Sequence, residues 1–417
     1  MKYPVAALAV AFSVLPLSFT SSASAQNRPS GGNVIVPESS VEHAEDRGLR
    51  AHTNILLLQP AGRALPQAGP PASGLIAETP ASLACVYKIV TAMTGCNQDT
   101  VTALPTGGFG AIAIVDAYDD PEAKTDLTNF STQFGLSAAK FQVVYAGGSE
   151  PAQDPTGGWE LEESLDIEWA HAMAPKAKIY LVEAASSNWS DLLAAVNTAS
   201  GLVATAGGGE VSMSWGSSEF EGENSLDSYF TTSNVVYFSS AGDSAGVNYP
   251  SASPNVVSAG GTTISRDPVS GNYESESAWY STGGGPSAYE ATPSYQSAIG
   301  GLNGARGTPD FSFDANPYTP VWVLDSMPYE GQGGAGSWWL VGGTSVSSPS
   351  LAGVVNNAGH KAGSTNAELT SIYANMAVSA DFHDITTGTC GVYQGYLSAK
   401  GYDFCTGVGT NVGKAAK

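Results

Sequence analysis

A serine in a glycine-rich segment near the C-terminal end of the chain is the first candidate for chemistry. Residues 342–349 read GGTSVSSP, with Ser345 at the centre. Two glycines permit a tight turn and Pro349 is tolerated in a first helical turn, so we expect Ser345 at a helix N-terminus. Unpaired backbone N–H groups there suit an attacking alkoxide and the oxyanion that it creates. An ordinary N-cap serine has the same pattern, so Ser345 needs partners to count as a nucleophile.

Two carboxylates spaced four residues apart are the first such partners. Glu162 and Asp166 lie in a predicted helix over residues 159–173 and neighbour its apolar stripe. Like charges at this spacing repel, so such a pair tends to share one proton and leaves a carboxylate that accepts a proton from serine at low pH. An acidic helix N-terminus favoured by the helix dipole is the alternative. A more solvated side of the helix is expected to carry Glu160, Ser164 and Glu168.

An aspartate on a glycine-flanked turn is the second partner. Asp243 follows a predicted strand in the segment FSSAGDSAG, residues 238–246. The C-terminal end of a strand in an α/β sheet points such a residue into an active site, although Asp243 could also bond to its own turn. A protonated carboxyl can donate a hydrogen bond to an oxyanion. We therefore hypothesise that activity is lost reversibly when the pH rises towards neutrality.

The elements that position these residues follow an alternating pattern. From residue 79 onward, short β-branched runs alternate with longer amphipathic segments, which predicts an α/β fold. We expect a doubly wound, mostly parallel sheet flanked by helices in a single large domain. The predicted strands are 111–115, 178–182, 211–214, 235–239 and 256–259, and the predicted helices are 125–134, 159–173, 190–199 and 345–357.

Together these segments resemble the sedolisin family of serine-carboxyl peptidases, which share the subtilisin fold but replace its Asp-His-Ser triad. The resemblance covers residues 79–413 and includes the run AHAMAP that ends the acidic helix and the strand VSMSWG. It implies that Ser345 is the nucleophile and Glu162 the general base. It also implies that Asp166 orients Glu162 and that Asp243 is the oxyanion-hole acid.

Some members of that family have a further carboxylate and a tryptophan supporting the catalytic residues. Asp116, which ends a predicted strand, and Trp215 occupy the corresponding positions, so we expect them to contribute hydrogen bonds behind the site.

The resemblance also implies one structural calcium ion. The matching segments would supply carboxylates from Asp384 and Asp403 and carbonyl oxygens from Ile385, Ala399 and Gly401. Hard oxygen ligands of this kind suit calcium.

Four cysteines suggest two local disulfides. Their positions favour the pairs Cys85–Cys96 and Cys390–Cys405 in an exported protein. Zinc ligation is the alternative, and neither pair has the short spacing of a zinc knuckle.

The N-terminus is typical of an exported protein. Lys2, an apolar run over residues 5–17 and the small residues Ala23-Ser24-Ala25 predict a signal peptide over 1–25. We interpret 26–78 as a poorly ordered leader or short pro-segment, shorter than the folded propeptide of many sedolisins, and 79–417 as the peptidase domain. No later segment reaches membrane-spanning length, so we expect a secreted protein.

The net charge of the chain limits the kinds of molecule that it can bind. The formal net charge is -22, from 16 Lys and Arg against 38 Asp and Glu. Nucleic acids and anionic membranes need basic patches, so neither is expected as a partner. We expect a monomer that acts on protein or peptide substrates in an acidic medium, where its carboxylates lose charge.

Three other functions stay open. A subtilisin-type triad would use Asp116 and a histidine, but none of His43, His52, His171, His360 and His383 lies in a His-Gly-Thr setting, and His171 is expected to be a structural helix residue. A catalytically idle relative that binds peptides would keep the fold without the chemistry. A glycosidase could use Glu162 with another carboxylate, but it would give Ser345 no role.

Overall fold

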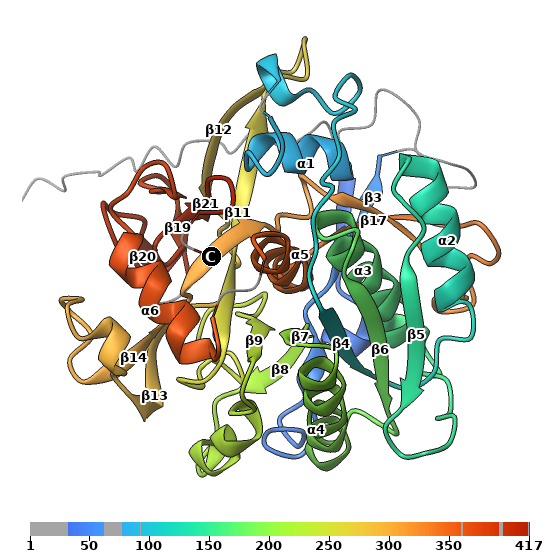
Figure 1. Ribbon diagram of the computed structural model, residues 1–417, viewed down its shortest axis with the longest axis horizontal. Coiled ribbons are helices and arrows are strands. Elements are labelled where there is room, and N and C mark those ends of the chain that lie inside the picture. Colours follow the sequence, from blue (N-terminus) through green and yellow to red (C-terminus); the bar gives the residue numbers. More distant parts are fainter. Residues whose placement is uncertain (1–31, 62–76, 92, 360–361, 392–394, 416) are drawn as a thin grey trace, which may run out of the picture.

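A computed structural model describes residues 32–61, 77–91, 93–359, 362–391, 395–415 and 417. The predicted signal peptide over 1–25 lies outside the described residues and stays an expectation. The described residues form a sheet-centred α/β fold, shown in Figure 1.

The central sheet has the order β18-β21-β15-β11-β9-β7-β4-β6-β5, with β12 beside β11. All the pairings from β5 to β21 along this order are parallel, while β12 and β18 pair antiparallel. The five predicted strands are all present, so the mostly parallel sheet is confirmed. Its strands are β4 (Ala111–Ala117), β5 (Lys140–Tyr145), β6 (Lys178–Ala184), β7 (Gly209–Met213), β9 (Val235–Ser240), β11 (Val257–Arg266), β12 (Tyr273–Ala278), β15 (Phe311–Asp314), β18 (Phe382–His383) and β21 (Thr410–Asn411).

Helices cover both faces of this sheet (Figure 1). Alternate residues of β4 point to opposite faces, as the pleat of a strand requires. Ile112 and Ile114 join the core that contains residues of α3 and α5, whereas Ala113 and Val115 join the core built around α4. The four predicted helices correspond to α2–α5. The described helices are α1 (Pro80–Val86), α2 (Ala123–Phe134), α3 (Gly158–Met173), α4 (Trp189–Thr205), α5 (Thr344–Asn357) and α6 (Thr365–Asn375), with short 3-10 turns η1 (Glu38–Ser40), η2 (Thr94–Cys96), η3 (Glu223–Phe230) and η4 (Ser294–Gln296).

Part of the expected leader is ordered, which corrects the prediction for 26–78. Residues 32–61 form β1 (Gly32–Ile35), β2 (His52–Thr53) and β3 (Leu56–Pro60). β3 lies between β1 and β17 (Trp338–Gly342) in an antiparallel sheet that ends with β16 (Val321–Leu324). Leu57 of β3 is fully buried in the main core, so apolar burial holds this segment on the domain.

Smaller strands complete the molecule. β2 and β10 (Asn248–Tyr249) flank β8 (Trp215–Ser218) in a three-stranded sheet. Two further hairpin-like pairs are β13 (Gly285–Ala291) with β14 (Ala305–Thr308) and β19 (Thr389–Cys390) with β20 (Tyr396–Leu397).

Helix α3 has no solvated side, which corrects the expectation for Glu160, Ser164 and Glu168. All three residues are buried, because α2, α5 and β16 pack around the helix. Each finds a polar partner inside. Glu160 accepts the Asp154 N–H at 2.6 Å, Ser164 donates to Asp120 at 3.3 Å, and Glu168 accepts the Leu324 N–H at 3.1 Å.

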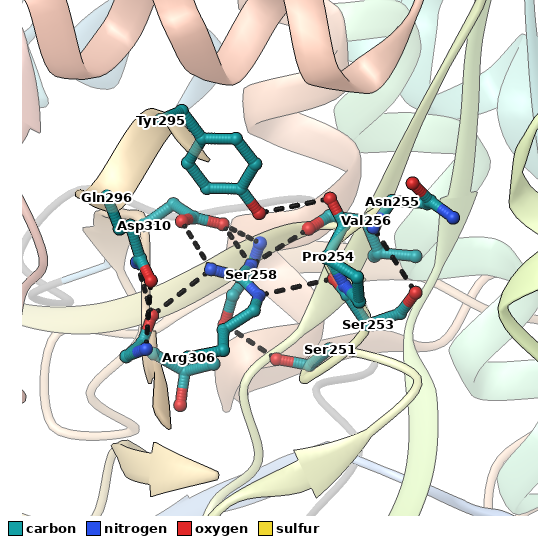
Figure 2. A network of polar contacts seen from close by, with 12 residues as sticks. Ser251, Ser253, Pro254, Asn255, Val256, Ser258, Tyr295, Gln296, Arg306 and Asp310 are labelled. Atoms are coloured by element: carbon teal, nitrogen blue, oxygen red, sulfur yellow. Dashed lines mark hydrogen bonds and ion pairs between the residues drawn. The ribbon is translucent and has the colours of Figure 1, made fainter. Parts of the chain in front are cut away.

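A buried ion pair fixes the turns that lead from β10 into β11. Arg306 donates to both carboxylate oxygens of Asp310, at 3.0 and 2.7 Å, and to the carbonyls of Ser253 and Val256 (Figure 2). The Asp310 carboxylate in turn accepts the Ser258 N–H at 2.8 Å. Since both charges are fully buried, these hydrogen bonds are what make the pair tolerable in the core.

Both expected disulfides are present. Cys85–Cys96 and Cys390–Cys405 have Cα–Cα distances of 5.4 and 5.5 Å. The second closes the loop that contains residues 399–403. Among the described residues, no helix has the length and apolar character needed to cross a membrane.

Candidate active site

Ser345 lies in the first turn of α5, two residues after the glycine that the turn requires. Gly343 caps this helix with φ 104°, a conformation that favours glycine. A Cβ on Gly343 would come within 2.1 Å of the Asn54 carbonyl oxygen and 2.4 Å of Asp243 Oδ2. The missing side chain therefore leaves room for two oxygens beside Ser345.

Ser345 and the carboxyls of α3 form one hydrogen-bonded chain. Ser345 Oγ is 3.0 Å from Glu162 Oε2, to which it can donate, and 3.1 Å from the Ser214 carbonyl oxygen. Glu162 and Asp166 hydrogen-bond to each other, and Ser214 Oγ donates to Asp166 Oδ1 at 2.8 Å. All of these side chains are fully buried. The structure thus brings Ser345 and Ser214 to the carboxyl pair of α3, although these segments lie far apart in the sequence.

The carboxyl pair holds its protons unusually tightly. Burial raises the pKa of Glu162 well above its ordinary value, and the neighbouring charges of Asp166 and Asp116 raise it further. Burial also raises the pKa of Asp166. In the described part of the chain, no other group donates to Glu162 Oε1 or Asp166 Oδ2. One shared proton satisfies both oxygens and leaves Glu162 Oε2 free to accept from Ser345.

Asp243 stands on the other side of Ser345. Its Oδ1 accepts the Thr344 N–H at 2.7 Å and the Thr344 hydroxyl at 2.9 Å. Its Oδ2, beside Gly343, has no donor among the described residues. Burial raises the pKa of Asp243 to about 7, against the lowering effect of the Thr344 hydrogen bonds. Below that pH the carboxyl is protonated, and Oδ2 can carry a proton to donate.

Asp116 and Trp215 both lie behind the site, but they are not bonded as expected. The Trp215 indole N–H donates to the Val115 carbonyl at 2.6 Å, and both Asp116 oxygens lack a partner among the described groups. Asp116 acts on the site through charge instead. Its pKa is raised by burial and then by the charges of Asp166 and Glu183.

The described histidines contact groups other than Ser345 and Asp116. His171 contacts the Ser137 carbonyl at 2.8 Å and is fully buried, as a structural helix residue should be. His43 pairs with Glu38, while His52 and His383 lie 3.9 and 3.7 Å from the carboxylates of Glu42 and Glu276. His360 lies outside the described residues. Among the other four, none hydrogen-bonds to Ser345 or Asp116, so the described residues contain no subtilisin-type triad.

Sequence reasoning missed two residues of the site. Ser214 lies in the strand motif VSMSWG, but only the fold shows that its hydroxyl bonds to Asp166. Asn54 lies in the expected leader, yet its N–H is 3.2 Å from Ser345 Oγ and its carbonyl oxygen accepts the Ser345 N–H at 3.1 Å. No motif marks Asn54, so the sequence alone offered no signal for it.

The segments expected to bind calcium are brought together by the fold. The Gly401 N–H donates to both oxygens of Asp384, and Asp403 accepts the N–H groups of Ala399, Cys405 and Thr406. Two carboxylates with nearby backbone carbonyls are hard donors, so their chemistry fits calcium. In the described part of the chain, no group of three or more His, Cys, Asp or Glu side chains could hold a metal. Carbonyl oxygens would therefore supply most of the ligands.

Comparisons with known proteins find relatives that match most of this chain. Sedolisin of Pseudomonas sp. (strain 101) is 26% identical over 348 residues, covering 74% of this chain and 57% of that protein. Kumamolisin of Bacillus sp. (strain MN-32) is 29% identical over 372 residues, covering 81% and 62%. A solved structure of Pseudomonas sedolisin, a serine-carboxyl proteinase complexed with two molecules of pseudo-iodotyrostatin, matches with TM-score 0.65 at 25% identity, covering 80% of this chain and 95% of that chain. No family model matches.

The parallel sheet with a serine at the start of a buried helix defines the class, a subtilisin-like α/β fold. Over most of its length the chain is similar to sedolisin and kumamolisin, and its fold is similar to that of a solved serine-carboxyl proteinase. It spans about three fifths of the length of the two curated relatives, 57% and 62%.

Behind the site lies an acid cluster, which we define as Asp116, Asp119, Asp120, Glu160, Glu163 and Glu183. All six are buried, and none takes part in an ion pair among the described residues. Burial is the largest cause of the raised pKa of three members, to about 7 at Asp120, about 8 at Glu160 and about 9 at Glu183. Neutral carboxyls are tolerated there, whereas ionised ones repel each other in a medium of low dielectric.

This cluster predicts that the protein loses stability as the pH rises. The folded-state pKa of Glu183, about 9, exceeds its ordinary value of 4.5, so its contribution is complete below about pH 4.5 and falls as the pH rises towards 9. Each such carboxyl contributes a slope of about 1.4 kcal/mol per pH unit in that window. Glu183→Gln should flatten the decline in the free energy of unfolding, measured by urea denaturation from about pH 4 to 8. The exposed Glu150→Gln is the control, and an equal decline in both variants would contradict the prediction.

Proposed function

We propose that the chain is a secreted, acid-acting serine-carboxyl peptidase that hydrolyses peptide bonds of proteins through an acyl-enzyme on Ser345. The hydrogen bond of 3.0 Å between Ser345 Oγ and Glu162 Oε2 is the observation that carries this proposal. A serine next to a carboxylate has a base for its proton without a histidine. Similarity to sedolisin and kumamolisin supports the reaction class.

Five residues have distinct roles in the proposed reaction. Glu162 takes the Ser345 proton as the nucleophile attacks, and later gives it to the leaving amine. Asp166 orients Glu162, and the two carboxyls share one proton. The Ser214 hydroxyl holds Asp166 in place. Asp243, protonated in acid, and the Ser345 N–H would stabilise the oxyanion.

Different observations support the proposed activity at low pH and the proposed secretion. The raised pKa values of Asp243 and Glu183 favour a medium in which these two groups are neutral. Two disulfides favour an oxidising compartment outside the cytoplasm. The net charge of -22 opposes nucleic acid as a partner, and protein or peptide substrates remain the proposed partners of a monomer.

A structural calcium ion is part of this proposal. Carboxylates of Asp384 and Asp403 and carbonyls of Ile385, Ala399 and Gly401 would hold it. When bound, the ion would cross-link two loops electrostatically. The disulfide Cys390–Cys405 already restrains the loop that supplies three of these ligands.

Loss of the nucleophile should abolish turnover. Ser345→Ala is expected to lower kcat by about 10⁶-fold, because covalent catalysis and proton transfer are lost together. The measurement is cleavage of a denatured protein at about pH 4. Ser350→Ala is the matched control, since Ser350 is buried in the same helix and its hydroxyl has no partner among the described groups. Equal cleavage by both variants would refute Ser345 as nucleophile. No cleavage by the unmodified protein would favour the idle peptide-binding relative.

Asp243 should set the upper pH limit of activity. Its pKa of about 7 means that the oxyanion donor is lost as the pH rises through neutrality. Removing such a donor costs about 10²–10³-fold in kcat. Asp243→Asn keeps a neutral donor at every pH, so the fall in kcat between about pH 6 and 8 should be weaker than in the unmodified protein. The exposed Asp99→Asn serves as control, and unchanged turnover of the unmodified protein from about pH 4 to 7 would contradict the role.

Calcium removal should destabilise the fold. Chelation is expected to lower Tm by several degrees, since a ligand present at about 100 times its Kd stabilises by ~2.7 kcal/mol. Asp384→Asn should lower Tm and make it insensitive to chelator. Calcium, and not magnesium, should restore the unmodified protein. A Tm that chelator leaves unchanged would count against the ion.

A further inference from the structure

Asn54 lies against Ser345 in the position that a substrate residue would take. Its N–H is 3.2 Å from both the Ser214 carbonyl oxygen and Ser345 Oγ, and its carbonyl oxygen accepts the Ser345 N–H at 3.1 Å. β2 before it pairs with β8, and β3 after it pairs with β17, so paired strands flank Asn54 on both sides. An extended peptide pairs with an open sheet edge in the same way. Asn54 therefore shows where the substrate residue that carries the attacked carbonyl would place its side chain.

The side chain of Asn54 contacts a further serine. Its amide nitrogen donates to Ser240 Oγ at 2.8 Å. Both residues are 1% exposed, so this hydrogen bond is shielded from water. Ser240 is thus the polar group that the site offers to this side chain.

The central sheet fixes the position of Ser240. It is the last residue of β9, and it pairs with Ala259 of β11. The chain then continues through Gly242, whose N–H donates to the Thr344 hydroxyl at 3.0 Å, to Asp243. Because the sheet holds one end of this short segment and the start of α5 holds the other, Ser240 keeps a fixed position relative to the reacting groups.

The Ser240 hydroxyl depends on the group that fills this position. In the described part of the chain, its hydrogen bond to Asn54 is the only one that Oγ makes. A buried polar group that loses its partner is costly. A substrate with leucine there would have nearly the shape of asparagine, but it would leave the hydroxyl unpaired. A substrate with asparagine would pair with it.

Size and charge narrow the choice further. The side chain of Asn54 is enclosed, so glutamine, which is one methylene longer, would strain the walls. Aspartate has the right shape, but it is charged above its ordinary pKa of about 3.9, and an ionised carboxylate is costly to bury. Asparagine is neutral at every pH and carries the donor that Ser240 accepts.

We propose that Ser240 is a specificity-determining residue, and that the site prefers substrates with asparagine immediately before the cleaved bond. This inference rests on the proposed peptidase function. It assigns to that function a substrate class, which is peptides with a short amide side chain at this one position.

The first test uses four internally quenched peptides that are identical except for asparagine, glutamine, aspartate or leucine before the cleaved bond. At about pH 4, kcat/KM should be highest for the asparagine peptide, and about 10- to 100-fold lower for the leucine peptide, which leaves a hydroxyl unpaired. The aspartate peptide should fall further behind as the pH rises from about 3 to 5, since its side chain ionises. Mass spectrometry of the products identifies the bond that is cut.

The second test is Ser240→Ala, which removes the acceptor and no catalytic group. We expect kcat/KM for the asparagine peptide to fall by about tenfold or more, because its buried amide then lacks a partner, while the leucine peptide is cleaved as fast or faster. Ser239→Ala is the matched control, since Ser239 is also buried in β9 and its side chain points to the opposite face of the strand. The control should keep the preference. A merely structural role of Ser240 would lower kcat/KM for all four peptides alike.

The outcomes separate this preference from the peptidase function. Equal kcat/KM for the asparagine and leucine peptides, or an unchanged ratio between them in Ser240→Ala, would overturn the preference and leave the peptidase function standing. If the unmodified protein cleaved none of the four peptides and no denatured protein, the peptidase function would be refuted, and the preference with it.

Discussion

The close approach of α3 and α5 is the contact on which the site depends. Glu162 belongs to one helix and Ser345 to the other, and their hydrogen bond exists only because the helices pack against each other. Gly353 makes this possible. A Cβ there would come within 2.6 Å of Met173 Cβ and 3.0 Å of the Ala170 carbonyl oxygen. A larger residue would separate the helices, and the distance between Glu162 and Ser345 would increase with them.

Burial of α3 has an electrostatic consequence. A helix wrapped by α2, α5 and the sheet has no surface on which to place its carboxylates, so Glu162, Glu163 and Asp166 are all inside. Charged carboxylates without cationic partners are costly there, whereas protonated carboxyls are neutral and can donate hydrogen bonds. Carboxyls with raised pKa values are thus spread over the architecture around the site, and Asp243 is one of them.

The same edges that would bind a substrate are occupied by the chain itself. The borders formed by β8 and β17 present backbone groups that need partners, and an extended segment supplies them on both sides of Ser345. This explains why Ser345 is fully buried. Apolar residues of β3 anchor the segment, since Leu57 is part of the main core.

Local patterns in the sequence determined the sheet, its main helices, the disulfide pairs and the identity of Ser345, Glu162, Asp166 and Asp243 as candidates. These features depend on short-range periodicity, on turn residues and on motif spacing, which the sequence displays directly.

Tertiary structure alone decided the rest, because it depends on which distant surfaces meet. Periodicity placed Glu160 and Glu168 on a solvated side, but packing by α2 and β16 buried them. The resemblance implied that Asp116 and Trp215 contribute hydrogen bonds behind the site, but the Trp215 indole donates to the Val115 carbonyl and neither Asp116 oxygen has a partner among the described residues. Asn54 carries no motif, and only the pairing of β2 and β3 with strands more than a hundred residues away brings it to Ser345.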